Sequence, residues 1–141
     1  MIVEVSGRGG AELLRRAVTE FGAAGHPTSY LDTDVAMAFV ATEGGTVSGW
    51  CYGYQLPRPD GTSMAYLHSI DVAERHRRQG LGRALLDAFL TEATRRGAAK
   101  AFLTTGSTNT PARALYESAG AEIAAQGPTE NYWFDLTERP T

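Results

Sequence analysis

The sequence predicts an α/β (α+β) fold in which helices cover both faces of a mixed, largely antiparallel central sheet of six to seven strands. Three observations support this prediction. Strand-like and helix-like segments follow one another along the chain, and three apolar runs between residues 36 and 72 are separated only by turn signals. The 141 residues, 43% of them apolar, suffice for one core but are short for two, so we expect a single domain over residues 1–141.

The N-terminal part of the chain predicts a strand, a helix and a loop. Residues 2–5 alternate as a first strand, and residues 11–21 carry apolar side chains at helical spacing. Residues 22–34 are rich in Gly, Pro, Ser, Thr and Asp, which is typical of a loop, with one helical turn near residues 30–34. Such a segment can cover a binding site, and His26 within it is either a solvated loop residue or a substrate contact.

Three strands are predicted next, at residues 36–42, 47–56 and 63–72. The connections read Glu-Gly-Gly-Thr and Pro-Arg-Pro-Asp-Gly, both strong turn signals, so the three strands form an antiparallel meander. Four aromatic residues recur at strand spacing: Trp50, Tyr52, Tyr54 and Tyr66. Packing in the core or in a dimer is the default interpretation of these rings, and stacking on a substrate is the alternative.

The last part of the chain predicts two helices and three strands. Residues 80–96 place apolar side chains on one helical face and end at Gly97. The remaining predicted elements are a short buried strand at 101–104, a helix at 111–119 with a Pro in its first turn, and two final strands at 121–125 and 131–136.

The turn that enters the helix at residues 80–96 has the composition of a phosphate-binding site. Gly80 and Gly82 leave no side chains to block a ligand, so consecutive backbone N–H groups can converge on phosphate oxygens at the start of a helix. The nearby arginines that add positive charge are Arg75, Arg77, Arg78 and Arg83. The sequence therefore predicts a site for a pyrophosphate.

The overall composition excludes several classes of protein. The formal net charge of −3 gives no global basic field for nucleic acid, and no apolar run is long enough to span a membrane. Cys51 is the only cysteine, which excludes an internal disulfide and a multi-cysteine metal site and fits a reducing compartment. We expect a cytoplasmic protein without a bound metal, and its twelve arginines against the single Lys100 suggest a bacterial genome rich in GC.

Two motifs together resemble the GNAT superfamily of N-acetyltransferases. The first is Arg-Arg-Gln-Gly-Leu-Gly at residues 77–82 after a strand, and the second is Asn-Thr-Pro-Ala-Arg-Ala-Leu-Tyr-Glu-Ser-Ala-Gly at residues 109–120. The resemblance covers about residues 36–136 and implies a GNAT-like acyl-CoA N-acyltransferase fold. Within the superfamily, residues 54–61 and 70–80 look like the aminoglycoside 3-N-acetyltransferase branch, which would connect the chain to antibiotic resistance.

The resemblance implies where the co-substrate, acetyl-CoA, would bind. The strand end would pair with the pantetheine arm like an added strand, and the glycine turn would hold the pyrophosphate. Asn109 would lie near the pantetheine, and Tyr116 would stand close to the sulfur. The full set of expected coenzyme-binding residues is Ile70, Asp71, Val72, Arg77, Arg78, Gln79, Gly80, Leu81, Gly82, Arg83, Asn109 and Tyr116.

The resemblance also implies catalytic roles. Tyr116 would act as the general acid that protonates the departing thiolate, although packing in the core is an alternative for this ring. An ammonium substrate must lose its proton before it attacks, yet Ser69 stands where many family members have Glu, and Thr-Thr-Gly-Ser at 104–107 replaces the acidic residue of the branch. His68 or Asp71 could be the base, Ser69 could orient a water, or the acceptor amine could have a lower pKa. Strand alternation puts Ser69 and Asp71 on one face and His68 on the other, unless a bulge intervenes.

The expected function is acetyl-CoA-dependent N-acetylation of a primary amine of a small molecule, such as an aminoglycoside-like polyamine, by direct attack in a ternary complex. A protein or peptide acceptor is one alternative. A second alternative is a coenzyme-binding regulatory module whose catalytic residues have decayed, which Ser69 and Thr105 suggest. Enzymes that this chain resembles are usually homodimers, so we expect a homodimer.

Overall fold

The computed structural model describes residues 1–22, 25 and 27–138, and in this part of the chain five strands form one sheet in the order β1-β2-β3-β4-β5. The strands are β1 (Ile2–Val5), β2 (Ala36–Glu43), β3 (Thr46–Pro57), β4 (Ser63–Val72) and β5 (Lys100–Phe102). Neighbouring strands from β1 to β4 are antiparallel, and β5 is parallel to β4. The mixed, mostly antiparallel sheet and the predicted meander are confirmed.

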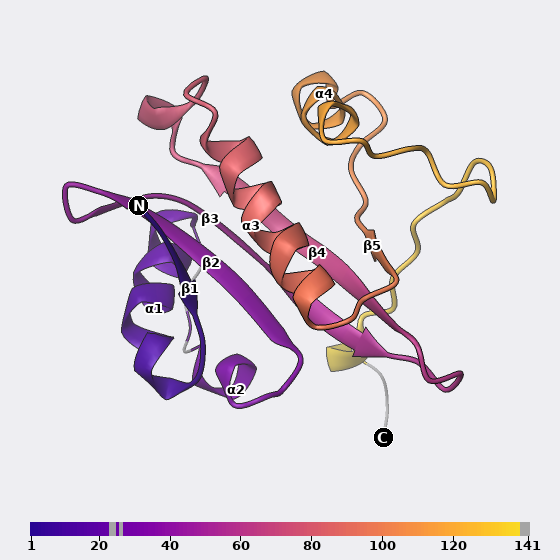
Figure 1. Cartoon of the computed structure of the whole chain (residues 1–141), viewed down its shortest axis with the longest axis horizontal. Coiled ribbons are helices and arrows are strands. Elements are labelled where there is room, and N and C mark those ends of the chain that lie inside the picture. The colour runs from indigo at the N-terminus through magenta and orange to yellow at the C-terminus, as the bar shows by residue number, and fades with distance from the viewer. Residues whose placement is uncertain (23–24, 26, 139–141) are drawn as a thin grey trace.

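Helices cover both faces of the sheet, as predicted (Figure 1). The four α-helices are α1 (Ala11–Glu20), α2 (Thr28–Leu31), α3 (Leu81–Arg95) and α4 (Thr110–Ser118). Helices α1 and α2 pack on one face of the sheet, while α3 and the inner residues of α4 pack on the other. Single turns of 3-10 helix occur at Arg8–Gly10, Glu74–His76 and Leu136–Glu138.

The core beneath α3 fixes the position of the helix that follows the glycine turn. Phe89, Leu85 and Leu86 of α3 pack against apolar side chains of β2, β3 and β4 and are almost fully buried. Cys51 of β3 lies in this core with no exposed surface, and its thiol donates to the carbonyl oxygen of Leu85 at 3.7 Å. The buried apolar surface holds α3 in place, so its N-terminus stays at the end of β4.

The core beneath α1 contains the side chain of Trp50. Trp50 is 8% exposed and lies in a cluster with Val5, Leu14 and Val40. The ring of Phe21 stacks on the Trp50 indole with centroids 5.9 Å apart and planes inclined by 7°. Because close packing leaves few alternative rotamers, the indole is held in one orientation.

A β-bulge interrupts the pairing of β3 with β4. Tyr52 pairs with Ser69, but the next residue, Gly53, pairs with Leu67, so His68 has no partner on β3. The His68 ring lies 5.1 Å from the ring of Tyr52, on the face that carries α1. The bulge allowed for in the expected alternation is therefore present, and the extra residue turns the His68 side chain to the face that Tyr52 occupies.

The two final strands predicted at residues 121–125 and 131–136 are absent, so the described sheet has five strands instead of six to seven. Residues 121–135 contain no helix or strand, and Figure 1 shows them running as a long loop after α4. Their large apolar side chains are 78–94% exposed, namely Ile123, Tyr132, Trp133 and Phe134. An apolar pattern becomes a strand only when a neighbouring edge pairs with it, and β5 offers only three residues.

Other expectations for individual elements are mostly met. The strand predicted at 101–104 is present as β5, but its residues are exposed and not buried, because no further strand flanks it in the described structure. The helical turn expected near residues 30–34 lies slightly earlier, as α2. Residues 23, 24 and 26 lie outside the described structure, and the expectation for His26 falls there.

Candidate active site

The turn between β4 and α3 combines two residues in the left-handed backbone region. Arg78 has a φ of 63° and Gly80 a φ of 78°. The left-handed conformation costs a residue with a Cβ about 1–2 kcal/mol, so a strained Arg78 marks a turn that the surrounding structure imposes. No side chain caps the N-terminus of α3, and a Cβ added to Gly80 would have no described atom within 4 Å. The first N–H groups of α3 therefore have no side-chain cap, and the phosphate site expected here stays a prediction.

Gly82 has a different environment from Gly80. A Cβ at Gly82 would lie 3.5 Å from Leu115 Cδ2 and 3.8 Å from Val72 Cγ2. These are ordinary van der Waals distances, so a Cβ would fit at Gly82. Gly80, with its left-handed backbone, is the glycine that the turn itself requires.

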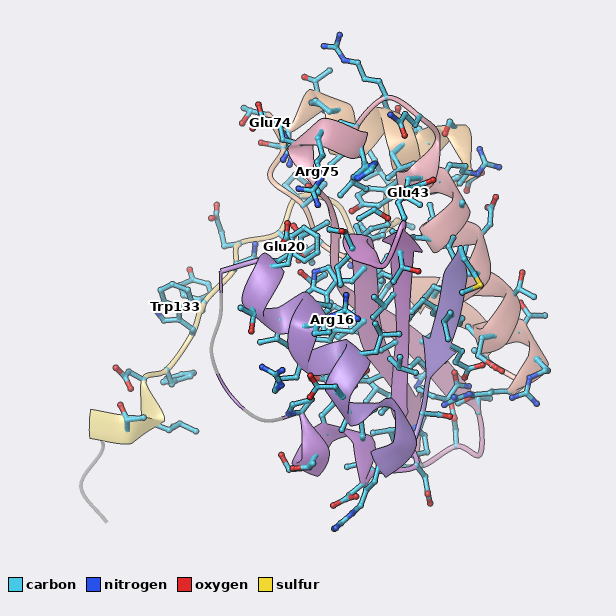
Figure 2. The ribbon with its side chains drawn as sticks, turned by 90° about the vertical axis from the view of Figure 1, so that its left-hand side faces the viewer. Arg16, Glu20, Glu43, Glu74, Arg75 and Trp133 are labelled. Atoms are coloured by element: carbon cyan, nitrogen blue, oxygen red, sulfur yellow. The ribbon has the colours of Figure 1, made fainter. Side chains whose placement is uncertain are left out.

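Three of the four arginines around this turn are engaged by other groups of the protein. Arg83 donates to Asp87 Oδ1 at 3.0 Å and to the carbonyl oxygen of Ser118 at 3.1 Å, so its side chain joins α3 to α4. Arg75 extends toward α1, where its guanidinium lies 3.6 Å from Glu20 (Figure 2). Arg77 stays at the strand end and donates to the carbonyl oxygen of Val72 at 3.2 Å. The positive charge expected for a diphosphate is thus less concentrated than the sequence suggested.

Helix α4 brings the second motif to the same end of the sheet. Asn109 accepts a hydrogen bond from the N–H of Ala112 at 3.2 Å and so caps α4, which is a structural role beside the coenzyme contact expected for it. Tyr116 is half-buried and packs against the core beneath α3. Burial raises the pKa of the Tyr116 phenol, and the negative charge of Asp71 raises it further. Tyr116 therefore keeps its proton at neutral pH, as a general acid must.

Asp71 occupies the centre of the residues that the structure brings together. Its Oδ2 accepts a hydrogen bond from the indole N–H of Trp50 at 2.8 Å and from the hydroxyl of Ser69 at 3.4 Å. The Asp71 charge contributes to the raised pKa of Tyr116. It also contributes at Tyr52, whose pKa is raised first by burial and then by neighbouring groups including this carboxylate. Ser69 and Asp71 thus contact each other directly, whereas the link from Asp71 to Tyr116 is electrostatic.

A cleft of about 610 Å³ opens beside Asp71, between the end of α1 and the turn after β4. Its lining residues are Glu20, Phe21, Asp71, Val72, Ala73, Glu74, Arg75 and Arg77. Figure 2 shows Glu20 at the end of α1 with Arg75 and Glu74 beyond it. Three carboxylates and two guanidinium groups therefore face a space that would hold a small polar molecule.

His68 is not part of this group of residues. Its exposed ring lies between Tyr52 and Tyr66, 5.4 Å from the Tyr66 centroid, and does not line the cleft. Tyr66 in turn stacks on Phe102 of β5 with centroids 4.8 Å apart. His68 thus belongs to an aromatic row on the sheet surface, and the row beyond Trp50 is only partly covered.

Two residues of the site were not anticipated in these roles: Glu20, which lines the cleft, and Trp50, which binds Asp71. Trp50 and Asp71 are directly opposite each other in the β3–β4 register. The strand patterns alone do not specify this register, and the position of Glu20 depends on how α1 packs on the sheet.

The described residues give two further facts about ligands and location. No group of three or more His, Cys, Asp and Glu side chains in residues 1–22, 25 and 27–138 is placed to hold a metal ion. In the same part of the chain, every helix is too short or too polar to span a bilayer.

Comparison with known sequences gives a family match and partial relatives. Residues 11–121 match the acetyltransferase (GNAT) family. The chain is 46% identical over 56 residues to the ribosomal protein bS18-alanine N-acetyltransferase of Escherichia coli, which is 40% of this chain and 38% of that protein. It is 32% identical over 102 residues to an L-methionine sulfoximine/L-methionine sulfone acetyltransferase of Salmonella typhimurium, which is 70% of this chain and 60% of that protein. The matches thus span less than two thirds of these relatives.

Solved structures share the fold over nearly the whole chain. An aminoglycoside acetyltransferase from an uncultured soil metagenomic sample, in complex with trehalose, superimposes with a TM-score of 0.81 at 18% identity, covering 96% of both chains. A second such enzyme from a soil sample gives a TM-score of 0.79 at 25% identity, again over 96% of both chains. An aminoglycoside N-acetyltransferase in complex with CoA gives 0.72 at 19% identity, covering 96% of this chain and 97% of the other.

Proposed function

This chain belongs to the acetyltransferase (GNAT) family, and we propose that it transfers the acetyl group of acetyl-CoA to a primary amine of a small molecule by direct attack in a ternary complex. The observation that carries the proposal is the position of Asp71. Its carboxylate is held by Trp50 and Ser69 and borders a cleft next to the open turn at the start of α3. The Asp71 carboxylate as proton acceptor, the cleft as the site of the amine and the turn as the site of the coenzyme phosphates would thus adjoin one another.

The residues present fit acetyl-CoA. The left-handed turn at Arg78 and Gly80 and the uncapped start of α3 leave N–H groups for the two phosphates. The edge of β4 near Ile70 and Val72 would pair with the amide groups of the pantetheine arm, because β4 and β5 pair only between residues 64–66 and 100–102. Beyond this short ladder, no described strand pairs with β4 on its β5 side, and at Val72 the carbonyl oxygen accepts from the Arg77 guanidinium.

The chemistry requires three proton transfers. The ammonium loses one proton to become a nucleophile, and its nitrogen then forms a bond to the thioester carbon while the bond from that carbon to sulfur breaks. The thiolate gains a proton from the general acid, and the nitrogen loses its second proton, which would restore that acid. Asp71 would accept the proton from the ammonium, and Ser69 would hold the carboxylate through its hydroxyl. Tyr116, which keeps its phenolic proton at neutral pH, would protonate the thiolate. His68 is then not required.

The cleft supports a cationic acceptor. Glu20 and Glu74 lie with Asp71 on its lining, and these carboxylates would attract the ammonium groups of an aminoglycoside-like polyamine. The structural neighbours that are aminoglycoside acetyltransferases agree with this class. A protein or peptide acceptor is the second candidate, because a 56-residue stretch is 46% identical to an enzyme named for a ribosomal-protein alanine.

The test is release of coenzyme thiol across a panel of amines. We expect wild-type protein to turn over an aminoglycoside and a simple diamine faster than a peptide that begins with alanine. Asp71→Asn and Tyr116→Phe should each lower kcat by about 100-fold or more and leave acetyl-CoA affinity, measured by calorimetry, unchanged.

Each other outcome of the panel has a definite meaning. Preference for the alanine peptide would contradict the small-molecule acceptor and favour the protein acetyltransferase. Tight binding of acetyl-CoA without turnover of any amine would contradict catalysis and favour the regulatory module.

We also propose that the protein is a homodimer. Support comes from the C-terminal segment, where Tyr132, Trp133 and Phe134 are 87%, 94% and 78% exposed. Consecutive aromatic side chains with this exposure are typical of a surface that packs against a partner. The two additional strands expected from the sequence would form if this segment pairs with a sheet edge in such an assembly.

A further inference from the structure

We propose that Trp50 is a positioning residue that fixes the carboxylate of Asp71 as the proton acceptor of the reaction. This inference rests on the proposed function and adds to it a residue that does not touch the substrate. Trp50 is instead argued to act through Asp71, by a single hydrogen bond to one carboxylate oxygen.

The first argument is the register of the sheet. Trp50 on β3 is directly opposite Asp71 on β4, and paired side chains on one face of antiparallel strands lie about 5 Å apart at Cβ. The indole Nε1 donates to Asp71 Oδ2 at 2.8 Å, which is the length of a strong hydrogen bond to a charged acceptor. The contact is therefore set by the fold and not by a mobile surface side chain.

The second argument is that the donor itself cannot move. Trp50 is 8% exposed, with the Phe21 ring stacked on it and the Tyr52 ring 4.8 Å away. A buried indole N–H that loses its acceptor leaves an unpaired donor, which is unfavourable away from water. The indole thus resists any rotation of the Asp71 carboxylate that would break this bond.

The third argument is that the bond leaves one oxygen for chemistry. Trp50 and Ser69 both donate to Oδ2 of Asp71, so the lone pairs of Oδ1 stay available to receive a proton. A general base works only when its oxygen is held within hydrogen-bond reach of the proton it removes. Trp50 supplies that restraint from the core, and Asp71 itself lines the cleft.

The bond can be tested without any substrate, because the chain contains only two tryptophans, Trp50 and Trp133. A nitrogen-15 correlation spectrum should show two indole N–H signals, and Trp133→Phe assigns them. We expect Asp71→Ala to move the Trp50 signal and to leave the Trp133 signal in place. An unmoved Trp50 signal would overturn the proposal, because it would mean that the hydrogen bond is not formed.

The positioning role is tested by a double-mutant cycle on acetyl transfer. Trp50→Phe keeps an aromatic ring against Phe21 but removes the N–H donor. We expect it to lower kcat by about 10- to 100-fold with acetyl-CoA affinity unchanged, and to cause no further loss in an Asp71→Asn background. The matched control is Trp133→Phe, the same chemical change at an exposed ring away from the body of the molecule, which should keep wild-type kcat (Figure 2).

The outcomes separate this inference from the proposed function. The contrary result is that Trp50→Phe lowers kcat by the same factor in the wild-type background and in the Asp71→Asn background. In that case the tryptophan does not act through Asp71, and the proposal is overturned. If the wild-type protein itself transfers no acetyl group to any amine, the proposed function fails, which is a different and separately visible result.

Discussion

Gly80 and Gly82 occupy one short motif but contribute to the site in different ways. Gly80 has a left-handed backbone and open space around it, while Gly82 lies against Leu115 and Val72. A side chain at Gly80 would stand where a ligand approaches the N–H groups of α3. A methyl group at Gly82 would make ordinary van der Waals contacts with Leu115 and Val72.

Gly80→Val should weaken acetyl-CoA binding by more than tenfold, because a branched side chain would occupy the approach to the turn. Left-handed strain should also reduce the free energy of unfolding by about 1–2 kcal/mol. Gly61→Val is the matched control, because Gly61 has a φ of 85°, has open space around it and lies in the distant β3–β4 turn. Calorimetry should find normal coenzyme affinity in the control, and unchanged affinity in Gly80→Val would refute the phosphate site.

At this scale the catalytic and coenzyme-binding roles predicted from the sequence stay predictions. The structure shows that Ser69 and Asp71 contact each other and that the Asp71 charge contributes to the raised pKa of Tyr116. The hydrogen bond from Trp50 was not predicted, because it depends on which residues of β3 and β4 are opposite each other. Strand patterns alone do not specify that register.

At the scale of elements, the β3–β4 pair determines the geometry of the site. Its bulge at His68 shifts the register between the outer and inner parts of the two strands. Gly53 makes this possible, since a Cβ there would lie 1.9 Å from the carbonyl oxygen of Tyr66 and 2.9 Å from the Phe89 ring. The backbone of β4 and the core beneath α3 therefore both require glycine at this position.

Gly53→Ala should lower the free energy of unfolding by more than about 2 kcal/mol, because the backbone of β4 must move to admit a methyl group. Urea unfolding followed by fluorescence measures the change. Gly106→Ala, at a position with no described atom near its Cβ and no left-handed backbone, should change stability by less than about 0.5 kcal/mol. Equal stability of the two variants would show that the tight contact at Gly53 is not real.

The elements that the sequence predicted well are those with internal signals. The helix at 80–96 has an apolar face and glycine at its boundaries, and the three strands of the meander are separated by strong turn signals. The final strands at 121–125 and 131–136 have the apolar pattern but depend on a partner edge far along the chain. Such dependence on tertiary pairing is the reason that strand patterns mislead more often than amphipathic helices.

At the scale of the whole molecule, the C-terminal segment exposes apolar surface that a partner could cover. Ile123, Tyr132, Trp133 and Phe134 expose large apolar side chains within a short stretch. The row of Tyr52, Tyr66 and Phe102 reaches the β5 edge of the sheet, which adds partly exposed aromatic surface there. Association of two copies would cover both surfaces at once.

The double substitution Tyr132→Ser with Phe134→Ser should shift the protein from dimer toward monomer, because it removes apolar surface without touching the described core. Sedimentation equilibrium over a range of concentrations measures the shift. Arg58→Ser, at an exposed position in the β3–β4 turn, is the control and should keep the oligomeric state of the wild type. A wild-type protein that is monomeric at all concentrations would contradict the homodimer.

The burial of Cys51 has a consequence for the design of an activity assay. Burial raises the pKa of this thiol to about 12, so the folded protein presents no reactive thiolate near neutral pH. A disulfide dye added during turnover would then report only coenzyme set free by the reaction, with no background from the catalyst. The same dye added with denaturant would count one thiol per chain, so a single reagent can report both the product formed and the fraction of protein that has lost its fold.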